Sequence, residues 1–317
     1  MDIDRITGML TGVMLGDMLG STVEGWSPQQ VEEKHGRITG LLPGSCTTDD
    51  WQLTVAVSEA LIQSGMDMDA QAAAHVAAMK ESSSRWGRTT NVAVHSLAVG
   101  KHWSKSGQLL GIGNGVVMKL APLAAILAAT TADAERGKVE QFAIDLTRMT
   151  HRNRLAAAAT LAHMNALAWC LRIKPGNFSR AAFITLVTAH AKSATILAPP
   201  DAVQFDDLVE RLADLPSYAR SNPDHISEGL RGDSYVRDSL PLSYAFFLRH
   251  PSSIKSMFET ASAGEDADTN CSMVGALLGA LNGTVVFPAA LVEQVPAAQR
   301  AEVADLAERL TSRFMAG

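Results

Sequence analysis

The seven residues at positions 264–270, GEDADTN, place three acids directly before one of the least charged stretches of the sequence. Glu265, Asp266 and Asp268 fall within four positions, whereas positions 269–283 carry no charge. If a helix begins directly after Asp268, this residue can be its N-cap, because an aspartate accepts hydrogen bonds from the free amides of a first turn. Capping requires only one acid, so the additional carboxylates indicate that this segment binds something.

The segment TTDDWQLT, at positions 47–54, contains the same combination of residue types. Thr48 can cap a helix whose first positions are Asp49 and Asp50. Acids in a first turn are also stabilised by the helix dipole, by about 0.3–1 kcal/mol, which is the purely structural interpretation. If the two helix starts converge, four aspartates would meet Thr48 and Thr269 in one pocket, and their mutual repulsion would require a counter-charge.

Carboxylate and hydroxyl oxygens are hard ligands that suit Mg²⁺, Mn²⁺ or Ca²⁺. Four acids could hold two divalent cations, and a two-metal site can activate water for hydrolysis. Zinc is not indicated, because the three cysteines are isolated in the sequence and no histidine pair has ligand spacing. Cys46, Cys170 and Cys271 are too few and too widely spaced for a disulfide framework, which favours a reducing compartment.

The stretch GIGNGVVMKLAPLA, at positions 111–124, is a glycine-rich loop that runs into a predicted helix. Exposed amides at such a junction can receive a phosphate, although a tight turn is the structural alternative. The spacing differs from that of a Walker loop. Glu24, at the end of the first predicted helix, and His151 are further candidates. Asp17 lies inside the same apolar helix, where burial would require a hydrogen-bonded or ionic partner.

Helices must position these residues, because apolar residues recur at helical spacing along most of the chain and alternating apolar and polar residues are nearly absent. In the first helix Gly8, Gly12, Gly16 and Gly20 recur every fourth residue. Each costs about 1 kcal/mol of helix propensity against alanine, so we expect another backbone to approach closely there, and we expect this helix to be central. Further helices are predicted at 50–64, 69–80, 90–103, 121–130, 135–149, 153–172, 179–191, 203–213, 239–249, 251–262, 269–282 and 297–314.

The 317 residues have a globular composition, with 47% hydrophobic and 19% charged residues. The net charge of −6 predicts no general attraction to nucleic acid or to anionic membranes. The N-terminal MDIDRITGML has two aspartates where a signal peptide would carry lysine or arginine, and the apolar stretches fall short of the spanning length of roughly 18 residues. We therefore expect a soluble, cytoplasmic, monomeric protein that binds neither membrane nor nucleic acid.

Five motifs occur in an order that resembles the ADP-ribosylglycohydrolases, a family that includes dinitrogenase reductase-activating glycohydrolase and the ADP-ribosyl-acceptor hydrolases. The motifs are GDMLGSTVE, TTDD, GNGVVMKLAP, TH and GEDADT, and the resemblance runs from about residue 5 to residue 285. It implies an all-α fold, here one compact orthogonal multi-helix domain of about a dozen helices over residues 1–317. It also implies a centre of two Mg²⁺ or Mn²⁺ ions at the base of a cleft, where ADP-ribose is removed from modified arginine or serine.

The resemblance assigns roles to individual residues of this sequence. Either Asp266 or Asp268, both candidate catalytic residues, would steer the attacking water, and Glu24 matches a mobile glutamate that closes over the site. A contacting histidine corresponds to His151, and adenine would need an aromatic or histidine face, for which His151, Trp103 and Tyr235 are candidates. The implied metal ligands are Thr48, Asp49, Asp50, Asp266, Asp268 and Thr269, and the implied substrate-binding residues are Gly113, Asn114, Gly115, Met118 and His151.

Three residues depart from the family pattern. Trp51 replaces a small hydroxyl residue, Glu265 replaces a glycine, and Lys119 replaces an arginine. A tryptophan beside the metal ions would narrow the leaving-group side of the cleft, and Glu265 would add negative charge at its rim. The departures leave two alternatives: the same fold hydrolysing another N- or O-glycoside or nucleotide metabolite, or a non-catalytic module that binds ADP-ribose or neutralises a toxin. The substrate would be an ADP-ribosylated protein or a small molecule that contains ADP-ribose.

Overall fold

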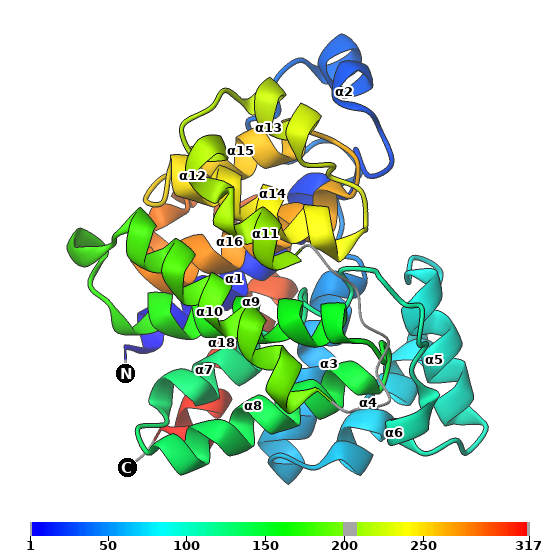
Figure 1. Cartoon of the computed structure of the whole chain (residues 1–317). Coiled ribbons are helices and arrows are strands. Elements are labelled where there is room, and N and C mark those ends of the chain that lie inside the picture. The colour runs from blue at the N-terminus through cyan, green and yellow to red at the C-terminus, as the bar shows by residue number, and fades with distance from the viewer. Residues whose placement is uncertain (1, 199–207, 316–317) are drawn as a thin grey trace.

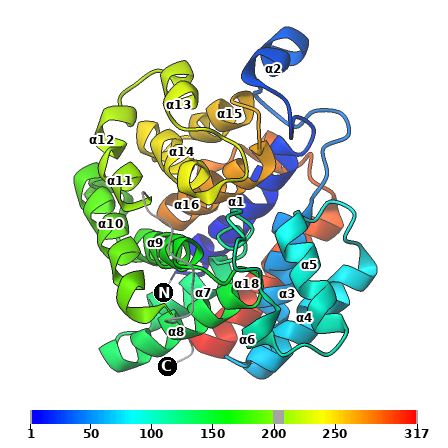
Figure 2. The ribbon, with the colours of Figure 1, turned by 45° about the vertical axis from the view of Figure 1, so that its right-hand side comes forward.

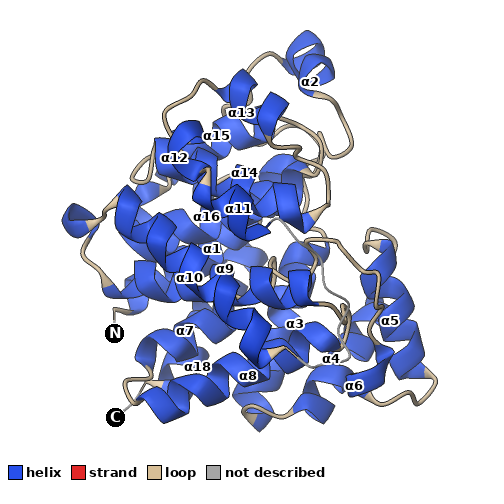
Figure 3. Cartoon of the chain, viewed as in Figure 1, coloured by secondary structure: helices blue, strands red, loops and turns tan. Residues whose placement is uncertain are grey.

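The computed structural model describes residues 2–198 and 208–315, which fold into helices joined by loops (Figures 1 and 3). Within these ranges two isolated bridges, Gln108 with His151 and Gly113 with Tyr235, are the only β-type pairings. The prediction of an all-α fold is therefore confirmed. The α-helices are α1 Ile3–Gly20, α2 Pro28–His35, α3 Asp49–Ser64, α4 Met68–Glu81, α5 Arg88–Ala98, α6 Trp103–Ser106, α7 Ala121–Ala129, α8 Asp133–Arg148, α9 Arg154–Arg172, α10 Arg180–Leu197, α11 Leu208–Ala213, α12 Leu215–Tyr218, α13 Pro223–Gly229, α14 Val236–Arg249, α15 Lys255–Ser262, α16 Ala267–Asn282, α17 Ala289–Val292 and α18 Ala297–Phe314.

Helices α1 and α16 lie side by side in the interior, with other helices around them (Figure 2). A Cβ atom on Gly12 would overlap the carbonyl oxygen of Gly275, and one on Gly20 would overlap the backbone of Ala267. The close approach predicted from the glycine row is thus confirmed. Because the two helices run antiparallel, the C-terminal end of α1 meets the N-terminal end of α16. This arrangement brings Asp17 beside the acids of the second motif.

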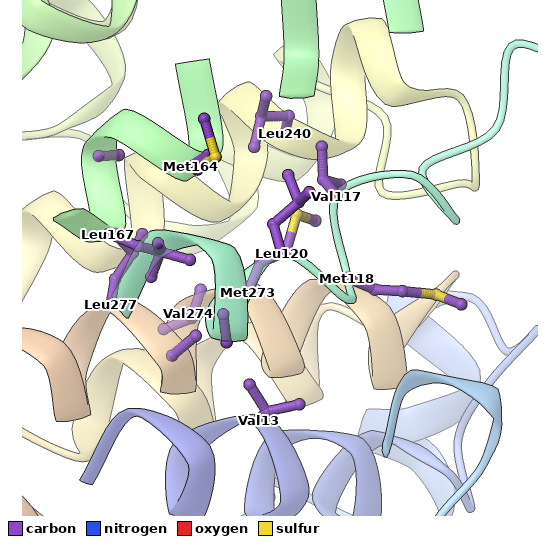
Figure 4. Close-up of a cluster of buried hydrophobic side chains, with 14 of the residues drawn as sticks. Val13, Val117, Met118, Leu120, Met164, Leu167, Leu240, Met273, Val274 and Leu277 are labelled. Carbon is purple, nitrogen blue, oxygen red and sulfur yellow. The ribbon is translucent and has the colours of Figure 1, made fainter. Parts of the chain in front are cut away.

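The apolar core continues from this helix pair into α9 and α14 (Figure 4). The segment 116–120 enters the same core, and Figure 4 shows Met118 extending away from its neighbours Val117 and Leu120. The side chains of Val117 and Leu120 therefore anchor the motif GNGVVMKLAP in the core, while the Met118 side chain, which is also buried, points in another direction. The other labelled core side chains are Val13 of α1, Met164 and Leu167 of α9, Leu240 of α14, and Met273, Val274 and Leu277 of α16.

The described residues contain eighteen α-helices, more than the dozen or so predicted. Most of the additional helices are short, with four to eight residues, as in α2, α6, α12, α13 and α17, and such lengths give little periodicity to detect. The helix predicted at 90–103 ends at Ala98 in the structure, Gly100 after it has a φ of 88°, and the separate helix α6 begins only at Trp103. Of the predicted helix 203–213, positions 203–207 lie outside the described residues, and the remainder is α11.

Membrane-spanning segments were not expected from the sequence. None of the helices in residues 2–198 and 208–315 combines the length and the hydropathy that crossing a bilayer requires.

Candidate metal centre and substrate cleft

Asp17 of α1 is a fully buried acid that accepts three hydrogen bonds from the start of α3. Its Oδ1 accepts from the Thr48 hydroxyl at 2.7 Å, and its Oδ2 accepts from the amides of Thr48 and Trp51 at 2.8 and 3.0 Å. Thr48 occupies the N-cap position but makes no capping bond with its side chain. The predicted N-cap position is therefore confirmed, but the side-chain capping bond is not formed, because Asp17 of α1 accepts from both the Thr48 hydroxyl and the Trp51 amide.

The second motif enters α16 through a tight turn. Gly264 and Glu265 have φ angles of 64° and 58°, in the left-handed region that favours glycine. The Glu265 amide donates to the Trp26 carbonyl at 2.6 Å, and the Asp266 amide donates to the Gly232 carbonyl at 2.9 Å. Helix α16 begins at Ala267 with Asp266 at its N-cap position, so the predicted N-cap at Asp268 is wrong by two residues. This earlier start places Asp268 in the first turn.

Two groups of three carboxylates meet where these helix ends converge. Asp17, Asp50 and Asp268 form one group, and Glu24, Asp266 and Asp268 form the other. In each group, one ligand oxygen per residue lies within 4.8 Å of the others. Asp268 belongs to both groups, and so it stands between two positions at which acids converge.

The hydroxyl groups and the remaining acid of the predicted ligand set lie around these two groups. The Thr269 hydroxyl donates to Asp50 Oδ2 at 3.0 Å, while Asp50 Oδ1 is buried without a partner in the described part of the chain. The hydroxyl of Thr48 donates to Asp17. Asp49 lines the cleft but joins neither group, and its Oδ2 accepts from the Gly87 amide at 3.3 Å.

Burial without enough donors destabilises the charged forms of these acids. Burial raises the pKa of Asp17 to about 6, against the effect of its three hydrogen bonds. The pKa of Asp49 is raised to about 7, also chiefly by burial. Burial and neighbouring carboxylates raise the pKa of Asp50 and of Asp268 well above the usual range. The cluster therefore needs positive charge if it is to be ionised near neutral pH.

The donor set fits hard divalent cations. All the candidate ligands are carboxylate or hydroxyl oxygens, as Mg²⁺ and Mn²⁺ prefer. The unpartnered Oδ1 of buried Asp50 is a further sign, because buried polar atoms are normally satisfied. Two members of these groups are absent from the predicted ligand set: Glu24, which was predicted as a catalytic residue, and Asp17, which was noted in the sequence only as an acid in an apolar helix. The hydrogen bonds that Asp17 accepts from the start of α3 also hold the predicted ligands of that segment in position.

A cleft of about 710 Å³ opens above the acids. This volume is within the usual range for pockets that bind small molecules. The five predicted substrate-binding residues all line it, namely Gly113, Asn114, Gly115, Met118 and His151. Of the predicted catalytic and metal-binding residues, the cleft is lined by Glu24, Asp49, Asp266, Asp268 and Thr269, whereas Thr48 and Asp50 do not line it.

Asn114 joins the glycine-rich loop to the acids. Its Nδ2 donates to Asp266 Oδ2 at 2.7 Å and to the Ser239 hydroxyl at 2.9 Å, and its backbone amide donates to the Ser234 carbonyl at 2.9 Å. The residue is almost fully buried. Sequence reasoning assigned Asn114 to substrate binding, and the structure adds that it fixes the orientation of the Asp266 carboxylate.

His151 is a neutral, buried residue at the same end of the cleft. Burial and the nearby Lys119 lower the pKa of His151 to about 3. Its Nδ1 lies 2.9 Å from the Thr150 hydroxyl. Tyr235 also lines the cleft, so both residues remain candidates for the adenine face. Trp103 does not, because it lines a separate surface depression between α4 and α6.

The three departures from the family pattern lie outside the cleft lining. Trp51 is 3% exposed, and its indole Nε1 donates to Glu302 of α18 at 2.8 Å. The expectation that Trp51 narrows the leaving-group side is therefore wrong, and the alternative of a different glycoside loses its main support. Glu265 occupies the left-handed turn described above. Lys119 is fully buried with its Nζ 3.2 Å from His75 Nε2, and burial lowers the pKa of Lys119 to about 8.

Sequence reasoning missed the wall of the cleft formed by residues 84–90. Arg85 in this wall pairs with Glu24, with 3.2 Å between Nη2 and Oε2, and the same Nη2 donates to the Ser21 carbonyl at 2.8 Å. The only signal in the sequence is the pair of arginines in SRWGRTT, and nothing in that pattern indicates which face of the molecule they reach. The pairing holds Glu24 at the mouth of the cleft.

Fold and site together define the class of protein: an all-α chain with an acidic site of oxygen ligands at the base of a cleft. The family model described as ADP-ribosylglycohydrolase matches residues 1–316. A solved structure described as an ADP-ribosylglycohydrolase-related protein complex superimposes with a TM-score of 0.72, at 25% identity, over 99% of each chain. The chain therefore belongs to the ADP-ribosylglycohydrolase family, and the resemblance found in the sequence is confirmed.

Two curated relatives are more distant in sequence. An uncharacterized protein of Archaeoglobus fulgidus is 22% identical over 287 residues, which cover 87% of each chain. The uncharacterized protein YegU of Escherichia coli K12 is 23% identical over 323 residues, which cover 94% of this chain and 93% of the relative. Both similarities extend over most of the chain, but both relatives are uncharacterized and so indicate no substrate for this protein.

Proposed function

We propose that this protein is a Mg²⁺- or Mn²⁺-dependent hydrolase that cleaves the glycosidic bond between ADP-ribose and a modified protein side chain. Arginine is the first candidate for the acceptor and serine is the second. The observation that carries this proposal is the pair of carboxylate groups that share Asp268 at the base of the cleft. Membership of the family supplies the class of substrate.

The cleft offers separate places for the parts of ADP-ribose. The distal ribose would lie above Asp266 and Asp268, next to the bond that is cleaved. Gly113 and Gly115 carry no side chains, so the ligand can approach the backbone of their loop closely. The neutral His151 and the ring of Tyr235 would provide faces for adenine.

When bound, two divalent cations would neutralise the acids, hold the ribose hydroxyls and lower the pKa of a bound water. Asp266 is suited to orient that water and to accept its proton, because Asn114 fixes its carboxylate and burial raises its pKa. The anionic cluster would also favour an oxocarbenium-like transition state. Glu24 stands at the mouth of the cleft, where it can close over the distal ribose.

The proposal is tested by measuring ADP-ribose release from arginine- and serine-ADP-ribosylated proteins with Mg²⁺, Mn²⁺ or EDTA. We expect metal-dependent release from at least one acceptor and its loss in Asp266→Asn. The exposed Asp214→Asn serves as a matched control with wild-type activity. If ADP-ribose binds but no acceptor is cleaved, the non-catalytic binding module is the better description.

A further inference from the structure

A second depression, of about 720 Å³, lies between α3, α4 and α18 and has no role in the function proposed above. Helices α3 and α4 form a hairpin joined by residues 65–67, and α18 packs against α3 (Figure 2). We call this depression the α3–α4 groove. It is as large as the cleft, yet the two share no lining residue. The groove is therefore a separate surface feature, and its partner must be inferred from its own residues.

The floor of the α3–α4 groove is formed largely by small side chains of α4. Five alanines of this helix line it, namely Ala70, Ala73, Ala74, Ala77 and Ala78. Ala73 and Ala77 are exposed. Because the side chains at the contact set the distance between packed helices, these alanines allow another helix to approach α4 closely.

Ala73 and Ala77 also line a smaller depression, of about 440 Å³, on the other side of α4. We call it the α4–α6 depression. Val99 stands in the sequence between Ala98 and Lys101, which line this depression, and it is 86% exposed. Helix α4 is thus a wall shared by two depressions, one of which has an exposed apolar side chain at its rim.

The two depressions carry opposite charges. Within residues 2–198 and 208–315, no lysine, arginine or histidine lines the α3–α4 groove, whereas three glutamates do, namely Glu59, Glu81 and Glu302. The α4–α6 depression is lined by Lys80 and Lys101, whose ammonium groups have no ion-pair partner in the described part of the chain. Lys80 and Glu81 are neighbours in the sequence, yet they line opposite sides of α4.

These properties make the surface complementary to itself. A two-fold axis parallel to α4 exchanges the two sides of the helix, so it places the acidic groove of one copy against the basic depression of the other. The two α4 helices would pack in parallel through Ala73 and Ala77. Lys80 of each copy would face Glu81 of the other, and Val99 would face the alanine floor. Each of these contacts occurs twice in a two-fold dimer, and complementary charges fix how the copies are aligned.

We propose that the chain forms a symmetric dimer in which the α3–α4 groove of each copy is occupied by the α4–α6 surface of the other. The occupant is a second copy because one continuous surface carries both the acidic groove and the basic, apolar rim that fits it. A dimer departs from the monomer expected from the sequence. Its interface uses none of the residues that line the cleft.

Sedimentation equilibrium of the full-length protein, over a wide range of protein concentration, tests the proposal. We expect twice the mass of the 33.7 kDa chain at high concentration. Ala77→Glu should abolish the dimer, because it places an acid and extra volume against the partner's acidic groove. Ala182→Glu on α10 is the control, since Ala182 is exposed and lines neither depression, and it should dimerise as wild type does. A wild-type chain that stays at 33.7 kDa, or an Ala77→Glu variant that still dimerises, would overturn the inference.

A charge exchange tests the alignment of the two copies. Lys80→Glu and Glu81→Lys should each weaken self-association about tenfold or more, because like charges would then face each other. An equimolar mixture of the two variants should restore association, whereas Lys192→Glu on α10, an exposed control, should have no effect. A mixture that associates no better than its components would overturn the inference. Thermal unfolding as in wild type shows that a loss of association is not a loss of folding, and the oligomeric state is measured without reference to the proposed hydrolase.

Discussion

Asp17 of α1 and Thr48, the N-cap residue of α3, are joined by two hydrogen bonds, from the Thr48 amide at 2.8 Å and from its hydroxyl at 2.7 Å. The pair connects the glycine-row helix α1 to the first acidic motif. The Asp17 carboxylate therefore both accepts hydrogen bonds at the start of α3 and holds the candidate metal ligands of that segment in position. Asp17 is both a structural cap and a member of the group Asp17, Asp50 and Asp268.

Asp17→Ala should lower the free energy of unfolding by about 1–3 kcal/mol, because buried donors at the start of α3 lose their acceptor. Metal-dependent activity should fall at the same time. Asp67→Ala is the matched control, since Asp67 caps α4 with bonds to the amides of Asp69 and Ala70 at an exposed site. Its removal should cost about 1 kcal/mol and leave activity intact. If both variants are folded and Asp17→Ala is as active as Asp67→Ala, the second role of Asp17, in holding metal ligands, is contradicted.

Gly12→Ala should destabilise the protein by about 3 kcal/mol or more, because its Cβ would overlap the Gly275 carbonyl and α1 would separate from α16. Gly137→Ala in α8 is the control, since no atom lies within 4 Å of the added Cβ. This change should stabilise the helix by about 0.5–1 kcal/mol. Urea unfolding measures both effects, and a similar midpoint for the two variants would argue against the close backbone packing.

The metal-free protein, kept in EDTA, should lose stability as the pH rises from 5 to 8. The folded-state pKa values of Asp17 and Asp49, about 6 and about 7, lie above their unfolded values. Their contribution is fully present below the unfolded pKa of about 3.9 and is lost as the pH passes 6 and 7. Thermal unfolding in EDTA across this range tests the prediction. Asp50→Asn should flatten the decline, and Mg²⁺ should raise the melting temperature more at pH 7.5 than at pH 5.5.

Arg85→Gln should leave the free energy of unfolding within about 1 kcal/mol of wild type, because the Arg85–Glu24 pair is partly exposed. Turnover should nevertheless fall, since Glu24 would lose the contact that holds it at the cleft mouth. Arg309→Gln breaks a comparably exposed pair with Glu59 of α3 and should leave turnover unchanged, because neither residue lines the cleft. Steady-state kinetics of both variants provide the comparison. Unchanged turnover in Arg85→Gln would contradict the role of Arg85 in holding Glu24 at the mouth of the cleft.

The sequence was sufficient to predict features that arise from local pattern. The glycine row predicted a close helix neighbour, and the acids at two helix starts indicated a cation site on the condition that those starts converge. Features that depend on packing between distant segments were not predictable. Trp51 follows Asp50 directly, yet its side chain lies against α18 rather than in the cleft. Similarly, Arg88 lines the cleft only because α5 packs beside the glycine-rich loop, which no spacing in the sequence reveals.

The most direct test of the central claim is the stoichiometry of Mn²⁺ binding, measured by calorimetry on the wild-type protein and on Asp268→Asn. The two carboxylate groups share Asp268, so the account predicts two Mn²⁺ ions in wild type and weakened binding of both in the variant. Asp214→Asn should bind two ions as wild type does. A wild-type protein that binds no Mn²⁺, or an Asp268→Asn variant that still binds two ions with unchanged affinity, would contradict the account.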